Sequence, residues 1–98
     1  MYQIFYHKLV LTDDFRKFSK IEKKKIVRAI KKRLATDPEV FGKPLGADLK
    51  GYYRLRVDFY RIIYRIDKGK IIVFIVKIGL RRNSKVYIEA AKRLKLLK

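Results

Sequence analysis

The sequence predicts an α+β fold in which a pair of helices packs on one face of a mainly antiparallel sheet. Apolar residues recur at helical spacing over residues 12–36 and again after residue 84. Over residues 52–78 they follow strand patterns instead, and residues 2–6 form a short opening strand. The predicted order is therefore β-α-α-β-β-β-α, in one domain that spans residues 1–98.

Capping residues predict where the first two helices begin. Thr12 can cap a short first helix, and Ser19 with Glu22 has the spacing of a capping box for a second helix. Pro38 should end this second helix near Thr36, because the residue before a proline is displaced from the helical region. The two helices should then form a hairpin.

The predicted sheet follows a connection over residues 37–51, which contains two Pro and three Gly and should have little regular structure. Strands are expected over residues 52–57, 60–66 and 71–78, with side chains that alternate between the two faces of the sheet. A last helix should begin at Ser84. Its expected apolar stripe is Tyr87, Ala90, Ala91, Leu94 and Leu97.

The composition predicts an anionic partner, because 27 Lys and Arg face only 9 Asp and Glu, for a net charge of +18. The chain has no cysteine and its glycines do not form a phosphate-binding loop, so we expect neither a structural metal nor a cofactor. No apolar run reaches the roughly 20 residues of a membrane helix. Asp13 and Asp14 stand where a signal peptide needs small residues, so we expect a cytoplasmic protein without membrane association.

Four arginines should project from adjacent strands on the sheet face opposite the core: Arg54, Arg56, Arg61 and Arg65. Three more cations, Lys77, Arg81 and Arg82, should come from the neighbouring strand end and loop. Together these groups could hold several phosphates. A solvated charged face without a ligand is the alternative. Because so many like charges on one surface cost stability, we favour RNA binding, with Arg65, Lys77, Arg82 and Lys85 as contacts to RNA or the ribosome.

Five segments, in this order and spacing, carry a resemblance to a known family. They are LKGYYRLRV at residues 49–57, YRIIYRI at 60–66, IIVFIVKIG at 71–79, RRNSKVY at 81–87 and EAAKRL at 89–94. Together they resemble the RelE toxins of the RelE/ParE superfamily of toxin-antitoxin systems. The resemblance implies an endonuclease that cuts messenger RNA in the ribosomal decoding site. It also implies a cognate RelB-like antitoxin with an acidic segment.

The resemblance also implies roles for five residues. Arg54 and Arg56 fall where such toxins carry basic residues, often lysines, that contact the scissile phosphate. Arg61 matches a phosphate-binding arginine, Arg81 a catalytic arginine and Tyr87 a tyrosine proposed as general base. Because arginines replace lysines at positions 54 and 56, the relative roles of these two residues at the phosphate stay open.

The residue types fit this chemistry. Metal-free RNA cleavage needs a base, a group that stabilises charge on the phosphate and a proton for the departing oxygen. Arginine suits charge stabilisation, and this is the role we expect for Arg81, because a guanidinium does not readily give up its proton. A tyrosine next to cations can act as the base, since the cations favour its phenolate. The alternative for Tyr87 is a packing role on the apolar stripe.

Two other functions stay open on the sequence alone. A ParE-like toxin that poisons DNA gyrase would share the fold, but that group generally lacks Arg61, Arg81 and Tyr87 together. A non-catalytic RNA-binding module would need the basic face but no particular tyrosine. For the RNA-cleaving toxin, we expect the antitoxin to cover the basic face or to displace the last helix, a basic amphipathic segment.

Overall fold

The computed structural model describes residues 1–80 and 84–96 of the chain. The strands are β1 (Gln3–Tyr6), β2 (Lys43–Pro44), β3 (Tyr52–Val57), β4 (Tyr60–Asp67) and β5 (Ile72–Leu80). They form one sheet in the order β1-β5-β4-β3-β2, in which β1 runs parallel to β5 and the other neighbours are antiparallel. The predicted α+β fold with a mainly antiparallel sheet is therefore confirmed.

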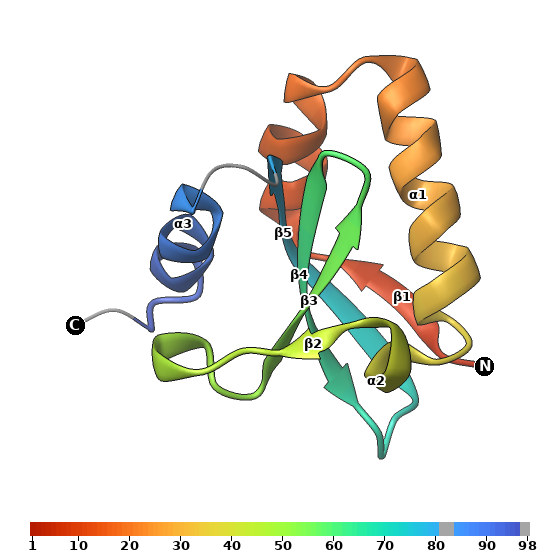
Figure 1. Ribbon diagram of the computed structural model, residues 1–98, viewed down its shortest axis with the longest axis vertical. Helices are drawn as coiled ribbons and strands as arrows, with labels where there is room; N and C mark the ends of the chain where they lie inside the picture. Colours follow the sequence, from red (N-terminus) through yellow and green to blue (C-terminus); the bar gives the residue numbers. More distant parts are fainter. Residues whose placement is uncertain (81–83, 97–98) are drawn as a thin grey trace.

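Helices cover both faces of this sheet (Figure 1). The α-helices are α1 (Lys20–Leu34), α2 (Pro38–Phe41) and α3 (Lys85–Arg93). Three short irregular turns accompany them, η1 (Val10–Asp14), η2 (Phe15–Lys17) and η3 (Ala47–Leu49). Figure 1 shows α1 and α3 on opposite sides of the sheet. No helix within the described residues is long and apolar enough to cross a membrane.

The first arm of the predicted hairpin is an irregular helical segment, η1 followed by η2, and it does not begin at Thr12. The Thr12 hydroxyl donates to the backbone C=O of Lys8 at 3.2 Å, so Thr12 lies inside the helical segment. The segment begins earlier because β1 ends at Tyr6 and the chain turns at once, with Val10 N–H bonded to His7 C=O at 2.9 Å. The prediction that Thr12 caps this helix is wrong.

The second arm, α1, matches the prediction. Ser19 Oγ accepts from Glu22 N–H at 3.1 Å, and Glu22 Oε1 accepts from Ser19 N–H at 2.9 Å, which completes the capping box. The helix ends at Leu34, two residues before the predicted Thr36. Pro38 then occupies the first position of α2, where a proline is tolerated because its missing N–H is not needed.

The connection between α2 and β3 contains a fifth strand that the sequence did not predict. β2 pairs with the edge of β3, with Lys43 opposite Arg54 and Pro44 opposite Tyr53. A strand of two residues, one of them proline, has no alternating pattern to read, and proline is confined to edges and strand starts. The sheet therefore extends one strand beyond β3.

Apolar side chains form two layers, one on each face of the sheet. The larger layer packs α1, through Ile26, Ile30 and Leu34, against β3, β4 and β5. The smaller layer packs α3 and η3 against Ile63 and Val76. Because α3 covers part of the face on which the arginines were predicted, the exposed cations lie around this helix rather than on an open sheet.

Candidate functional site

The register of β3 and β4 brings the predicted arginines onto one face. Arg56 lies opposite Arg61, and Arg54 lies opposite Ile63, whose side chain packs under α3. Arg65 lies opposite Tyr52, further along the same two strands. Since side chains alternate between the faces of a strand, all four arginines lie on the α3 side of the sheet, as predicted.

Tyr87 of α3 reaches this group of arginines. Arg54 Nη1 donates to the Tyr87 hydroxyl at 3.4 Å, and the Arg61 guanidinium carbon lies 4.9 Å from the centre of the Tyr87 ring. All three side chains are half-buried. Three of the five predicted catalytic residues thus meet, although they come from β3, β4 and α3. We call Arg54, Arg61 and Tyr87 the tyrosine-arginine site.

The other predicted contacts do not belong to this cluster of three side chains. Arg56 is exposed beside Arg61, and Lys85 is exposed in the first turn of α3. Arg65 stacks on the Phe74 ring, with its guanidinium carbon 4.7 Å from the ring centre. It follows Arg61 by four positions on β4, a distance of about 13 Å along a strand. Arg81 and Arg82 lie outside the described residues.

Lys77 is not on the exposed basic face, and its predicted role as an RNA contact is wrong in this structure. It lies opposite Ile63, beneath α3, and its side chain is only 6% exposed. Its ammonium group is 3.3 Å from an Asp14 carboxylate oxygen and 3.7 Å from one of Glu89. Two carboxylates therefore neutralise Lys77, which the strand pattern had predicted to contact RNA.

Asp14, the partner of Lys77, is a buried carboxylate whose role the sequence did not reveal. Its side chain is 1% exposed and accepts from Ile78 N–H at 2.9 Å and from both terminal nitrogens of Arg93 at 2.8 Å. Burial alone would raise the pKa of Asp14. The hydrogen bonds from Arg93 and Ile78 and the charge of Lys77 outweigh burial, so that the pKa lies below its usual value.

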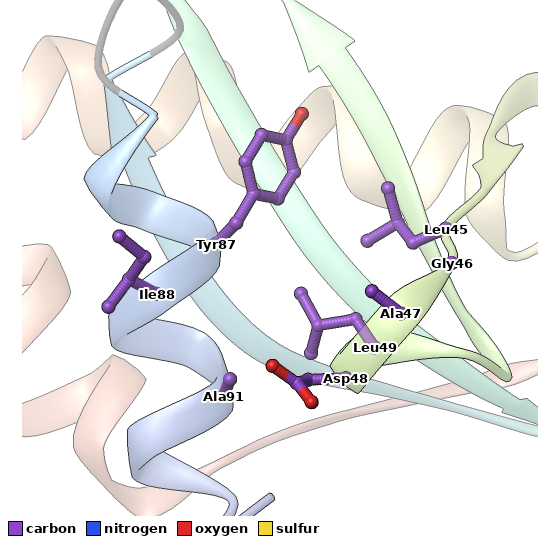
Figure 2. A pocket seen from close by; sticks show the side chains of 8 residues that line it. All are labelled: Leu45, Gly46, Ala47, Asp48, Leu49, Tyr87, Ile88 and Ala91. Atoms are coloured by element: carbon purple, nitrogen blue, oxygen red, sulfur yellow. The ribbon is translucent and has the colours of Figure 1, made fainter. Parts of the chain in front are cut away.

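An open groove of about 250 Å³ borders Tyr87. One wall is formed by residues 45–49, and the other by Tyr87, Ile88 and Ala91 of α3. Figure 2 shows the Tyr87 side chain projecting from α3 above this groove, with Asp48 facing the helix near Ala91. The lining is mainly apolar. The groove adjoins the tyrosine-arginine site. The sequence did not predict it, because the segment 45–49 that forms one wall has no regular pattern.

No group of three or more His, Cys, Asp or Glu side chains in the described ranges is arranged to hold a metal ion. The tyrosine-arginine site offers the following groups for chemistry. Two guanidinium groups can bind the oxygens of a phosphodiester. A phenol oxygen beside them can exchange a proton with a neighbouring hydroxyl.

Comparisons with known proteins bear on the family of this chain. The family model described as ParE toxin of type II toxin-antitoxin system, parDE, matches residues 4–84. The mRNA interferase toxin RelE of Escherichia coli is 33% identical over 72 residues, which cover 74% of this chain and 72% of that protein. Toxin RelE of Mycobacterium tuberculosis is 41% identical over 51 residues, 52% of this chain and 53% of that protein.

Solved structures share the fold. The toxin-antitoxin complex RelBE2 from Mycobacterium tuberculosis contains a chain with a TM-score of 0.77 and 27% identity, which covers 84% of this chain and 93% of that one. The isolated Escherichia coli RelE toxin has a TM-score of 0.68 at 23% identity, over 96% of this chain and 99% of that one, which shows the fold alone.

The fold and these matches define a toxin of a type II toxin-antitoxin system. Within that class, the chain belongs to the RelE-type toxins of the RelE/ParE superfamily. The resemblance read from the five sequence segments is confirmed.

Proposed function

We propose that this toxin cuts messenger RNA on the ribosome, with its own side chains and without a metal ion. The observation that carries the proposal is the tyrosine-arginine site, in which the Tyr87 hydroxyl lies 3.4 Å from Arg54 Nη1 and the Arg61 guanidinium covers the Tyr87 ring. The name of the Escherichia coli relative, mRNA interferase toxin, supports RNA as the substrate. A packing role alone would not require the Tyr87 hydroxyl to meet a cation.

In the proposed reaction, Tyr87 acts as the base. Its phenolate takes the proton of a ribose 2′-hydroxyl, and the 2′-oxygen forms a bond to the adjacent phosphorus. The bond from phosphorus to the 5′-oxygen then breaks, and the proton passes through solvent to that oxygen. The products are a 2′,3′-cyclic phosphate and a 5′-hydroxyl.

The arginines stabilise the negative charge that grows on the phosphate during this step. Arg54 and Arg61 contact Tyr87 and are therefore placed to hold the phosphate next to the base. Arg56, opposite Arg61 on the neighbouring strand, can bind another phosphate oxygen. By its resemblance to the family, Arg81 is proposed to stabilise the leaving 5′-oxygen. Preorganised donors of this kind contribute about 10²- to 10³-fold each.

The ribosome would supply the alignment of the substrate. The chain has a single histidine, so it lacks a histidine pair that could serve as both acid and base. Holding the 2′-hydroxyl in line with the phosphate can account for a large part of a rate enhancement. We assign Arg65 and Lys85 to contacts with RNA around the tyrosine-arginine site, and from the sequence alone we keep Arg82 as a contact with RNA. We exclude the buried Lys77 from this set.

The proposed protein partner is a RelB-like antitoxin with an acidic segment. Structural neighbours of this chain were solved as complexes of toxin and antitoxin, including RelBE2 and an archaeal RelE-RelB complex from Pyrococcus horikoshii. A net charge of +18 favours an acidic partner, because negative charge relieves the repulsion among the cations while it excludes RNA.

Expression of the toxin without a partner tests this proposal. We expect growth arrest with transcripts cut at codons in the decoding site, and much slower cutting of naked RNA. Tyr87→Phe should abolish the arrest. Tyr53→Phe is the matched control, because Tyr53 is also half-buried but stacks on Tyr64, in the layer that packs against α1. Arrest with intact transcripts would contradict the proposal, and broken DNA in those cells would favour the gyrase-poisoning alternative.

A further inference from the structure

α3, the helix that carries Tyr87, rests on the sheet through few apolar contacts. Its buried residues are Val86, Ala90 and Ala91, of which two are alanines with only a methyl group to bury. Val86 packs closely on Gly79, where an added Cβ would lie 2.8 Å from Val86 Cγ2. A helix of nine residues is too short to be stable on its own, so α3 needs attachment to the rest of the fold.

A second attachment lies at the other end of α3. Arg93 is 7% exposed and donates from both terminal nitrogens to the Asp14 carboxylate at 2.8 Å. The same guanidinium donates to the backbone C=O of Val76 at 3.0 Å. Arg93 thus joins α3 to η1 and to β5 at once. Lys77 lies 3.3 Å from Asp14 and 3.7 Å from Glu89 of α3, and adds to the same connection.

The two attachments fix the rotation of α3 as well as its distance from the sheet. Arg93 follows Val86 by seven residues, nearly two helical turns, so both lie on the helix face that meets β5. Tyr87 follows Val86 by one residue and points about 100° further around the axis. With one face held on β5, the Tyr87 side chain is directed to Arg54 and Arg61 on β3 and β4.

We propose that Asp14 and Arg93 are positioning residues for Tyr87, which hold α3 at the height and rotation at which the phenol meets Arg54 and Arg61. The inference rests on the proposed function, because the position of Tyr87 matters only if its hydroxyl takes part in cleavage. A displacement of about 1 Å at a reacting group can cost about 10²-fold in rate. The pair therefore contributes to the reaction without contact with the substrate.

Hydrogen exchange tests the attachment without any cleavage assay. Arg93→Met removes the ion pair and keeps an unbranched side chain, and Lys92→Met removes an exposed cation from the same turn. We expect the amides of residues 86–94 to exchange about ten- to hundredfold faster in Arg93→Met, with β3 to β5 unchanged. The Lys92→Met control should match the unmodified protein. Equal protection of residues 86–94 in both variants would overturn the proposal.

A double-mutant cycle on programmed ribosomes tests the link to Tyr87. Arg93→Met should lower kcat by about ten- to hundredfold with little change in KM, whereas the same substitution in a Tyr87→Phe background should change little. Arg93→Lys, which keeps the charge, should recover part of kcat. An equal loss in both backgrounds would overturn the positioning role. If no variant cuts RNA, the proposed function fails, while the exchange experiment still decides whether the pair holds α3.

Discussion

Replacement of Asp14 by alanine should be among the most destabilising single changes in this protein. The Asp14 side chain is 1% exposed and faces Lys77 and Arg93, whose side chains are 6% and 7% exposed. Without the carboxylate, Arg93 loses its counter-charge and Lys77 keeps only the more distant Glu89, 3.7 Å away. Removal of one partner from a buried ion pair lowers the free energy of unfolding by about 3–5 kcal/mol. This is a large part of the roughly 5–15 kcal/mol that is typical of native proteins.

Urea unfolding followed by circular dichroism measures this loss. Asp13→Ala is the matched control, because Asp13 neighbours Asp14 but, among the residues that the structure describes, accepts a side-chain hydrogen bond only from the exposed Thr12 hydroxyl, at 3.1 Å. Its replacement should cost about 1 kcal/mol or less. If the loss comes from orphaned cations, the triple variant Asp14→Leu, Lys77→Met, Arg93→Met should recover much of it. Equal losses for Asp14→Ala and Asp13→Ala would refute the reasoning.

Three further predictions concern the substrate, the pH and the partner. Arg61→Ala should lower the cleavage rate about 10²- to 10³-fold with little effect on ribosome affinity. Lys24→Ala, on α1, is the control and should change neither quantity. Equal effects of the two substitutions would indicate diffuse electrostatic binding. Because the pKa of Asp14 is lowered in the folded protein, its contribution to stability is complete above pH of about 4 and is lost as the pH falls through the lowered value. The unfolding free energy should therefore drop below about pH 4, and less so in Asp14→Asn. With antitoxin bound, unchanged hydrogen exchange over residues 52–66 would rule out masking of the basic face, and unchanged exchange over residues 85–96 would rule out displacement of α3.

The elements that the sequence predicted are those with long, regular patterns. α1 has a capping box and three buried residues at helical spacing, and β3 and β4 alternate over six and eight residues. β2 and the irregular turn η1 have no such pattern. β2 is too short, and η1 takes its shape from contacts with distant residues, including the bond from Ile78 N–H to Asp14. Local periodicity cannot report contacts of that kind.

The same distinction applies to the candidate site. Arg54 and Arg61 were predicted on one face because strand alternation fixes the side on which each residue lies. The approach of Tyr87 depends on where α3 docks, and only the resemblance to the family suggested it. Lys77 was misassigned because its counter-charge, Asp14, lies 63 positions earlier in the chain. The pair of carboxylates Asp13 and Asp14 in a strongly cationic chain was the available signal, and it also fitted a role at a helix end.

Analysis of the RNA ends produced on defined ribosomes tests the central claim most directly. Purified toxin should cut a messenger in the decoding site and leave a 2′,3′-cyclic phosphate and a 5′-hydroxyl. Tyr87→Phe, which keeps the ring under Arg61 but removes the hydroxyl bonded to Arg54, should cut at least about 10²-fold more slowly. Ends with a 3′-hydroxyl and a 5′-phosphate, or an unchanged rate in Tyr87→Phe, would contradict the account.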